Sequence, residues 1–388
     1  MRVVSDDQQW QAPGQTQPPP PTGAPAYPGA APAAPVAPTG WTPPPKPGLV
    51  PLRPMTLGTI LGASFTVMRR NPRTTLVPGL LLAVLLAIAS SAGIAAYFGA
   101  LDRVVTTTNV ADADAFFAGS MLILGLAALA GAALAAVATA LLQGLIVGEV
   151  ARGTVGEKLT FGALWRMYRG RFPALIGYSA LLVLAIAVGI VVVIALTFGI
   201  TLAATAGATG ASSAMGAVFA GFGVTVLGML GAAVLWAWIG TKLAFVPATI
   251  VLERRPIRAA IARSWRLVRG SFWRVLGITL LVSVMISVAT QIVATPVSFV
   301  LFLGTALLDP TGVGSASPDA MLGTVTLATI GTYAVTSIVT GIGLVVQSAT
   351  SSLLYLDLRM RREGLDLQLG RYVEAKQAGA AVPDPYLP

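Results

Sequence analysis

The sequence predicts an all-α polytopic membrane protein with six transmembrane helices and three cytoplasmic interfacial amphipathic helices. The first observation is composition: 55% of the residues are hydrophobic and 10% are charged, with a mean hydropathy of +0.79. Soluble domains carry about 25% charged residues. The second observation is a series of six long apolar stretches, and the third is a surface-helix motif that recurs at a 100-residue interval. Together they predict a pseudo-three-fold repeat of helix-plus-hairpin units.

Each apolar stretch is long enough to cross a bilayer. A transmembrane helix needs about 20 apolar residues to span about 30 Å of hydrocarbon. The stretches lie near residues 75–100, 118–148, 173–202, 215–248, 274–305 and 321–355. Short segments connect them, so six antiparallel spans are expected.

Basic residues are concentrated on one side of the predicted membrane. Of 25 Lys and Arg, 22 fall in the four regions 53–73, 149–171, 242–274 and 359–376. The positive-inside rule assigns these regions to the cytoplasm. We therefore expect a multi-pass protein of a bacterial plasma membrane with both termini cytoplasmic. The N-terminus has no apolar segment of the signal-peptide type, so no cleaved signal peptide is expected.

A basic amphipathic helix is predicted before each pair of spans. Its three copies have an aromatic residue at corresponding positions, and an arginine follows each aromatic by four residues; the residues are Phe65 and Arg69, Trp165 and Arg169, and Trp265 and Arg269, with Arg266 beside the last pair. Aromatic rings favour the headgroup region, and arginines favour lipid phosphates. These residues are therefore candidates for contact with anionic lipid. The alternative is that the arginines only set topology and anchor the helices.

Acidic residues recur just past the second, fourth and sixth spans. Glu149, Glu253 and Asp357 lie 104 residues apart. A ring of three acids would suit a cation or a cationic substrate. Pairing with nearby arginines is the favoured interpretation, since Glu149 precedes Arg152 by three residues and Asp357 precedes Arg361 by four. Glu253 directly precedes two arginines.

Four polar side chains interrupt the apolar stretches: Lys242, Gln143, Gln291 and Gln347. A charged residue at membrane depth indicates a site with a partner, and Glu149 and Glu253 are the nearest acids for Lys242. Alternatively, Lys242 extends to the interface, and the glutamines bond between helices. Pro247 and Pro296 should kink or end their helices but have no partners in the repeat, which weakens a transporter interpretation.

Three parts are expected along the chain. Residues 1–50 contain 14 of the 27 prolines, and this composition predicts a disordered cytoplasmic tail. The tail is either a tether or a docking segment for a cytoplasmic protein partner. Residues 51–370 form the membrane domain, with repeats of about 51–150, 151–254 and 255–362. Residues 371–388 are expected to be a disordered C-terminal tail.

Three segments resemble actinobacterial proteins of the glycerophosphoryl diester phosphodiesterase membrane-domain family: PLRPMTLGTILGASFTVMRRNP at 51–72, FVPATIVLERRPIRAAIARSWRLVRGSFWRVL at 245–276, and LLYLDLRMRREGLDLQL at 353–369. The resemblance covers about residues 51–370. It implies a membrane context near glycerophospholipid metabolism. It does not imply hydrolysis, because the catalytic barrel of the two-part relatives is absent from this sequence.

The absence of cysteine and histidine limits the chemistry of the chain. A Cys/His zinc site and histidine acid–base catalysis are excluded, and no cofactor, metal or nucleic-acid partner is expected. We predict a non-enzymatic membrane-organising or partner-scaffolding protein that contacts anionic lipid. The alternative is a transporter or lipid translocator with a polar path near Lys242 and the glutamines. The sequence does not indicate an oligomeric state.

Overall fold

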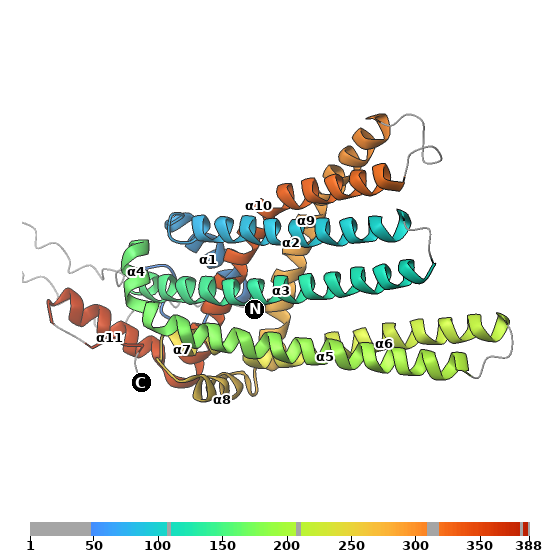
Figure 1. Ribbon diagram of the computed structural model, residues 1–388. Helices are drawn as coiled ribbons and strands as arrows, with labels where there is room; N and C mark the ends of the chain where they lie inside the picture. The colour runs from blue at the N-terminus through green and yellow to red at the C-terminus, as the bar shows by residue number, and fades with distance from the viewer. Residues whose placement is uncertain (1–47, 107–109, 207–210, 309–317, 381–382, 387–388) are drawn as a thin grey trace, which may run out of the picture. The chain divides into compact units, whose positions relative to one another are not determined.

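The computed structural model describes residues 48–106, 110–206, 211–308, 318–380 and 383–386. All regular secondary structure in these residues is helical (Figure 1). The proline-rich segment, for which we predict a disordered tail and a protein partner, lies almost wholly outside the described residues.

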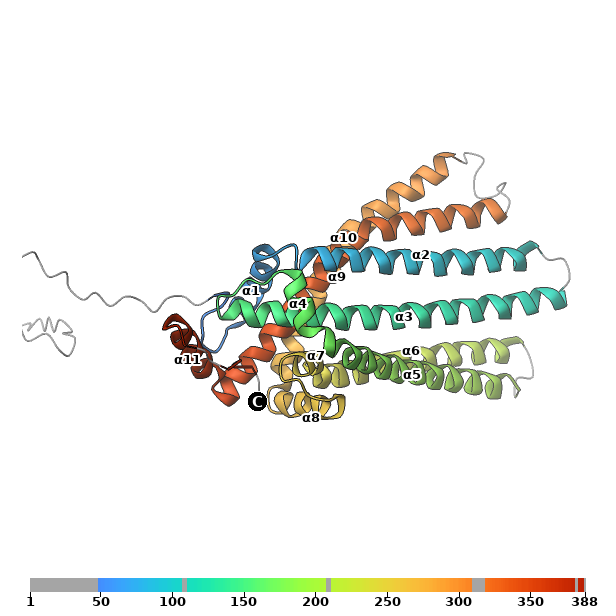
Figure 2. The same ribbon diagram turned by 60° about the vertical axis from the view of Figure 1, so that its left-hand side comes forward.

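Six helices are long and apolar enough to cross a membrane, as the hydropathy pattern predicts. Consecutive long helices form three hairpins, which Figures 1 and 2 show as antiparallel ribbons. The helices are α2 (Leu76–Thr106), α3 (Val110–Thr154), α5 (Phe172–Ala206), α6 (Ala211–Leu243), α9 (Phe272–Leu308) and α10 (Pro318–Glu363). The chain is therefore a multi-pass integral membrane protein.

A short helix precedes each hairpin: α1 (Leu57–Arg70), α4 (Phe161–Tyr168) and α8 (Ile257–Val268). Threonine side chains cap the first two, since Thr56 accepts a hydrogen bond from the Thr59 amide and Thr160 accepts one from the Ala163 amide. Such a cap satisfies one of the free N–H groups at a helix start. A single helical turn, η1 (Arg169–Arg171), joins α4 to α5.

Proline divides the fourth apolar stretch, as expected. Helix α6 ends at Leu243, and α7 (Val246–Val251) begins with Pro247 in its first turn. Ser264 of α8 spans the break: its hydroxyl donates to the Lys242 carbonyl at 2.7 Å and accepts from the Phe245 amide at 3.2 Å. Backbone groups freed in a membrane helix need such partners, so α8 closes the break in the fourth stretch. Pro296, in contrast, lies inside a continuous α9.

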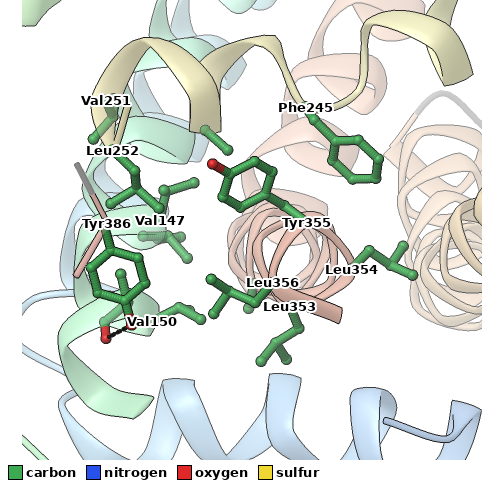
Figure 3. Packing of buried hydrophobic residues seen from close by; sticks show 14 of the residues in the cluster. Val147, Val150, Phe245, Val251, Leu252, Leu353, Leu354, Tyr355, Leu356 and Tyr386 are labelled. Carbon is green, nitrogen blue, oxygen red and sulfur yellow. Dashed lines mark hydrogen bonds between the residues drawn. The ribbon is translucent and has the colours of Figure 1, made fainter. Parts of the chain in front are cut away.

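The buried core gathers around the last part of α10 and the elements that surround it (Figure 3). Tyr355 is fully buried there, and its ring lies 6.1 Å from the ring of Phe245. Far from this core, the spanning helices expose apolar side chains such as Val191 and Leu227, which are 64% and 70% exposed. Such surfaces are suited to lipid.

The chain beyond α10 is more ordered than expected. Gly364, with φ of +63°, turns the backbone into α11 (Leu365–Gln377), and glycine adopts this left-handed conformation without steric cost. Farther on, Tyr386 is 1% exposed and bonds to the end of α3. The described residues of 371–388 thus differ from the disordered tail that we predicted, because a buried aromatic ring fixes a segment that is otherwise polar and proline-containing.

Candidate functional site

The three acids predicted at the span ends are all buried, but they lie in different environments. Glu149, Glu253 and Asp357 are 4%, 3% and 0% exposed. Among the described residues, no three Asp or Glu side chains lie close enough together to hold a metal ion. The acids therefore do not form the cation-binding ring that we considered.

Glu253 lies in a closed ring of polar contacts that joins α7 and α8 to α10. Arg263 donates to Glu253 at 3.0 Å and contacts Glu363 at 2.5 Å. Glu363 accepts from Arg359 at 3.0 Å. Arg359 donates a hydrogen bond to the Tyr355 hydroxyl at 3.3 Å. The Tyr355 hydroxyl in turn donates to Glu253 at 2.8 Å, and this contact completes the ring. Buried charges are stable only when they are paired and hydrogen-bonded in this way.

One further arginine binds Glu253 from outside this ring. Arg255 donates to Glu253 at 2.6 Å. Burial alone would raise the pKa of the Glu253 carboxyl, but the hydrogen bonds from Arg255 and Tyr355 and the charge of Arg263 outweigh burial and lower the pKa. Glu253 is therefore charged at neutral pH, and its contacts give it a structural role.

Asp357 of α10 connects Met55, in the segment before α1, to Arg274 of α9 and Arg361 of α10. Its carboxylate accepts hydrogen bonds from the Met55 amide at 2.7 Å and from Arg361 at 3.0 Å, and it forms an ion pair with Arg274 at 3.0 Å. Both arginines also donate to the Met55 carbonyl. The Asp357–Arg361 pair predicted from sequence is thus present, and two residues outside that prediction complete the site.

Glu149 does not pair with Arg152, so that prediction is wrong. Glu149 instead accepts from the Asn71 side chain at 3.2 Å, and its second oxygen has no hydrogen-bond partner. Arg152 binds Asp384 and lies 3.7 Å from Glu157. The C-terminal segment brings Asp384 to Arg152, and this long-range contact replaces the local pair.

The aromatic residues of the short helices are exposed, whereas the opposite faces of those helices are buried in protein. Phe65, Trp165 and Trp265 are 39%, 42% and 38% exposed. Ser64 and Ser264 occupy corresponding buried positions on α1 and α8, and Ser64 bonds to Thr350 of α10 at 2.9 Å. Each short helix is therefore packed on the rest of the protein by one face and leaves its aromatic residue exposed.

Four arginines close to these aromatic residues in the sequence are also exposed: Arg69, Arg169, Arg266 and Arg269. Within the described residues, none of these four side chains forms an ion pair. Their guanidinium groups are therefore available to an external anion.

Lys242 has neither of the acidic partners that we considered. Its ammonium group lies 5.4 Å from the ring of Trp265 and 5.5 Å from the ring of Phe272. Such cation–π contacts stabilise a lysine where no carboxylate is near. The side chain is directed to the short-helix side of α6.

The three glutamines separate into two groups. Gln143 and Gln347 line one cavity of about 560 Å³ between the spans, and Gln347 donates to Ser283 at 3.3 Å. Gln291 is exposed on α9 and does not line this cavity. The structure thus brings two of the four predicted polar residues together and leaves Lys242 and Gln291 apart from them.

Several residues of these networks could not be identified from sequence patterns. Tyr355 and Arg359 lie within or beside the sixth apolar stretch, and Asp384 and Tyr386 lie in the C-terminal segment. For the C-terminal segment, the available sequence signal was Tyr386, the aromatic residue of PDPYLP. An aromatic residue in an otherwise polar tail is a candidate for packing against the rest of the protein.

Comparison with known proteins assigns a family but no activity. Curated proteins give no significant match, and solved structures give none either. One family profile matches residues 55–355, which include all six spans except the end of the last. The chain therefore belongs to the family described as a domain of unknown function (DUF7847).

Proposed function

We propose that the protein is a non-enzymatic membrane-organising protein that binds anionic lipid at the cytoplasmic leaflet through α1, α4 and α8. The observation that carries this proposal is an exposed aromatic residue on each of the three helices, followed at or just past the helix end by an exposed arginine that forms no ion pair with the described residues. An amphipathic helix of this kind lies at the membrane surface. Each basic side chain near an anionic leaflet contributes about 1 kcal/mol of attraction.

The order of elements supports a repeated unit. Each short helix is followed by two antiparallel spans, so an even number of crossings separates α1, α4 and α8. The three helices therefore lie on one side of the membrane, and the positive-inside rule assigns that side to the cytoplasm.

The orientation can be tested directly because the chain has no cysteine. Arg166→Cys and Arg266→Cys each introduce one thiol on α4 or α8. In intact cells, a membrane-impermeant maleimide should leave both thiols unlabelled and should label them after lysis. Labelling of either thiol in intact cells would contradict the proposed topology.

Lipid binding can be tested with full-length protein in phosphatidylcholine vesicles that contain spin-labelled phosphatidylglycerol. The triple variant Arg69→Gln, Arg169→Gln, Arg269→Gln should lose about tenfold or more of its preference for the anionic lipid. The matched triple Lys variant keeps the charge and should retain the preference. Equal association of anionic and zwitterionic lipid with the wild type would refute the proposal.

The scaffolding part of the proposal concerns residues 1–50, which we expect to bind a cytoplasmic partner. Deletion of these residues should remove at least one protein from a pull-down of the full-length chain, and should leave lipid association unchanged. An identical set of captured proteins would reduce the proposal to lipid organisation alone.

A transporter or lipid translocator remains the second proposal, and the cavity lined by Gln143 and Gln347 favours it. The likeness of three segments to the glycerophosphoryl diester phosphodiesterase membrane-domain family is consistent with a lipid substrate. Proteoliposomes with a fluorescent lipid in both leaflets should then lose more than half of their fluorescence to an external quencher. A loss of only the outer half would exclude translocation.

A further inference from the structure

The cavity between the spans has a polar wall without charge. It lies between α3, α5, α6, α9 and α10, and it has a volume of about 560 Å³. This volume falls in the range of small-molecule sites, about 300–1,000 Å³. Hydroxyl and amide side chains line it from five different helices, among them Gln143, Ser179, Thr241, Thr279 and Gln347.

Among the residues that the structure describes, no charged side chain lines this cavity. Lys242 directly follows the lining residue Thr241, but its ammonium group lies against the rings of Trp265 and Phe272 instead. A charged group in this space would lack a counter-ion at membrane depth, which costs several kcal/mol. The lining therefore selects an uncharged ligand.

Hydrogen-bonding capacity remains unused on the cavity wall. Within the described part of the chain, the Gln143 amide and the Ser351 hydroxyl have no hydrogen-bond partner. Gln347 uses only its amide nitrogen, in the bond to Ser283. Polar groups inside a membrane protein are nearly always paired, so these groups are suited to the donors and acceptors of a bound molecule.

The cavity is reached from the lipid-facing surface. Two of its apolar lining residues, Trp236 of α6 and Leu280 of α9, are 46% and 57% exposed. These two residues belong both to the cavity lining and to the exposed surface of α6 and α9. Alkyl chains of a bound molecule would therefore reach the surrounding hydrocarbon along these two helices.

The polar groups of the cavity lie deeper in the membrane than the buried acids at the ends of the spans. This depth suits the polar head of an amphiphile. Gln143 precedes Glu149 by six residues and Gln347 precedes Asp357 by ten, which correspond to about 9 and 15 Å along a helix. A molecule bound there has its head closer to the bilayer centre than these two acids, and its chains closer still.

We propose that this cavity binds a neutral, hydroxyl-bearing amphiphile of the diacylglycerol type, with its head against Gln143, Gln347 and Ser351 and its chains between α6 and α9. The proposal goes beyond anionic-lipid binding at the leaflet surface and does not depend on it. It concerns binding alone, so it stands whether or not the bound molecule is moved across the membrane.

The test uses full-length protein in nanodiscs that contain a diazirine-labelled diacylglycerol. After irradiation, mass spectrometry should find the label on peptides of α6 and α9. Gly240→Leu should reduce labelling at least about fivefold, because Gly240 lines the cavity, a Cβ there meets open space, and the added side chain should occupy part of the cavity volume. Gln143→Leu should reduce it about fivefold by removing a hydrogen bond.

Two matched variants control for these substitutions. Gly231→Leu adds the same side chain to an exposed, open position on α6, and Gln291→Leu removes an exposed amide on α9. Both should keep wild-type labelling, and unchanged melting temperatures should confirm that all four variants fold. Labelling that is insensitive to Gly240→Leu and Gln143→Leu would overturn the site. Equal, cavity-dependent labelling by diazirine phosphatidylglycerol would overturn the preference for an uncharged head.

Discussion

Glu253 and Glu149 occupy corresponding places in the sequence but differ in how completely their charge is satisfied. The Glu253 carboxylate accepts from two arginines and a tyrosine, and its contacts close into a ring that includes Glu363. The Glu149 carboxylate accepts from one neutral amide of Asn71, and one of its oxygens has no partner.

The difference shows that a buried carboxylate does not stabilise the fold through burial alone. A buried charge stabilises a fold only where hydrogen bonds and opposite charges replace its hydration. Glu253 and Asp357 meet this condition, because each is paired with two arginines and accepts a hydrogen bond from one further donor. Glu149 does not meet this condition. We therefore expect the stability of the end of α3 to depend more on its contacts with the C-terminal segment, which are Arg152–Asp384 and Ala151–Tyr386.

Glu253→Ala should have the largest effect on stability. The substitution leaves Arg263 and Tyr355 in the ring without their acceptor, and loss of one partner of a buried pair costs about 3–5 kcal/mol. A large fall in the melting temperature of the purified protein is expected. Glu374→Ala, which removes an exposed acid of α11, should leave the melting temperature unchanged. Equal behaviour of the two variants would contradict the structural role of the ring.

Acid should weaken the same ring to a smaller degree, because a protonated Glu253 keeps part of its hydrogen bonding. The pKa of Glu253 in the folded state lies below the ordinary value of 4.5. Its stabilising contribution is therefore present above pH 4.5 and is lost as the pH falls through the lower, folded-state pKa. Melting temperatures measured from pH 7 to pH 3 should fall below pH 4.5, and Glu253→Gln should show a smaller fall. An identical pH profile for the two proteins would contradict this assignment.

Tyr386→Phe should have an intermediate effect on the end of α3. The phenol contacts the Ala151 carbonyl and the Thr154 hydroxyl, each at 2.6 Å. Burial raises the pKa of Tyr386, so the hydroxyl stays protonated and able to donate. Loss of the hydroxyl should cost about 1 kcal/mol, measured by chemical denaturation in detergent. Tyr97→Phe, on α2, is the matched control, and it should leave the transition unchanged.

Glu149→Gln should have the smallest effect and separates the two acids most clearly. The neutral amide keeps an acceptor for Asn71 and removes a charge that has only one hydrogen bond. The change in unfolding free energy should be within about 0.5 kcal/mol, or slightly favourable. A loss as large as that of Glu253→Ala would show that Glu149 has a partner that the structure does not contain.

Sequence patterns predicted the elements of the fold better than the contacts between them. Hydropathy predicted the six spans, and Pro247 predicted the division of the fourth stretch. These features depend on local composition and on a missing backbone N–H. The i, i+4 spacing likewise predicted the Asp357–Arg361 pair.

Long-range contacts were beyond those patterns. Met55 and Asp357 are 302 residues apart, and Arg152 and Asp384 are 232 apart. Nothing in the local sequence around Arg152 indicates that a distant carboxylate replaces Glu149. The direction of Lys242 depends on where α8 places Trp265, which is also a tertiary feature.

The docking of Tyr386 on the end of α3 has a consequence for biosynthesis. Its acceptor at Ala151 is made 235 residues before the tyrosine leaves the ribosome, which corresponds to roughly ten seconds or more of translation. During that interval the first hairpin can enter the membrane, while the end of α3 still lacks its hydrogen bonds to Tyr386. A nascent chain halted before residue 384 should therefore be cut by protease near Thr154, at a site that is protected in a chain containing Tyr386.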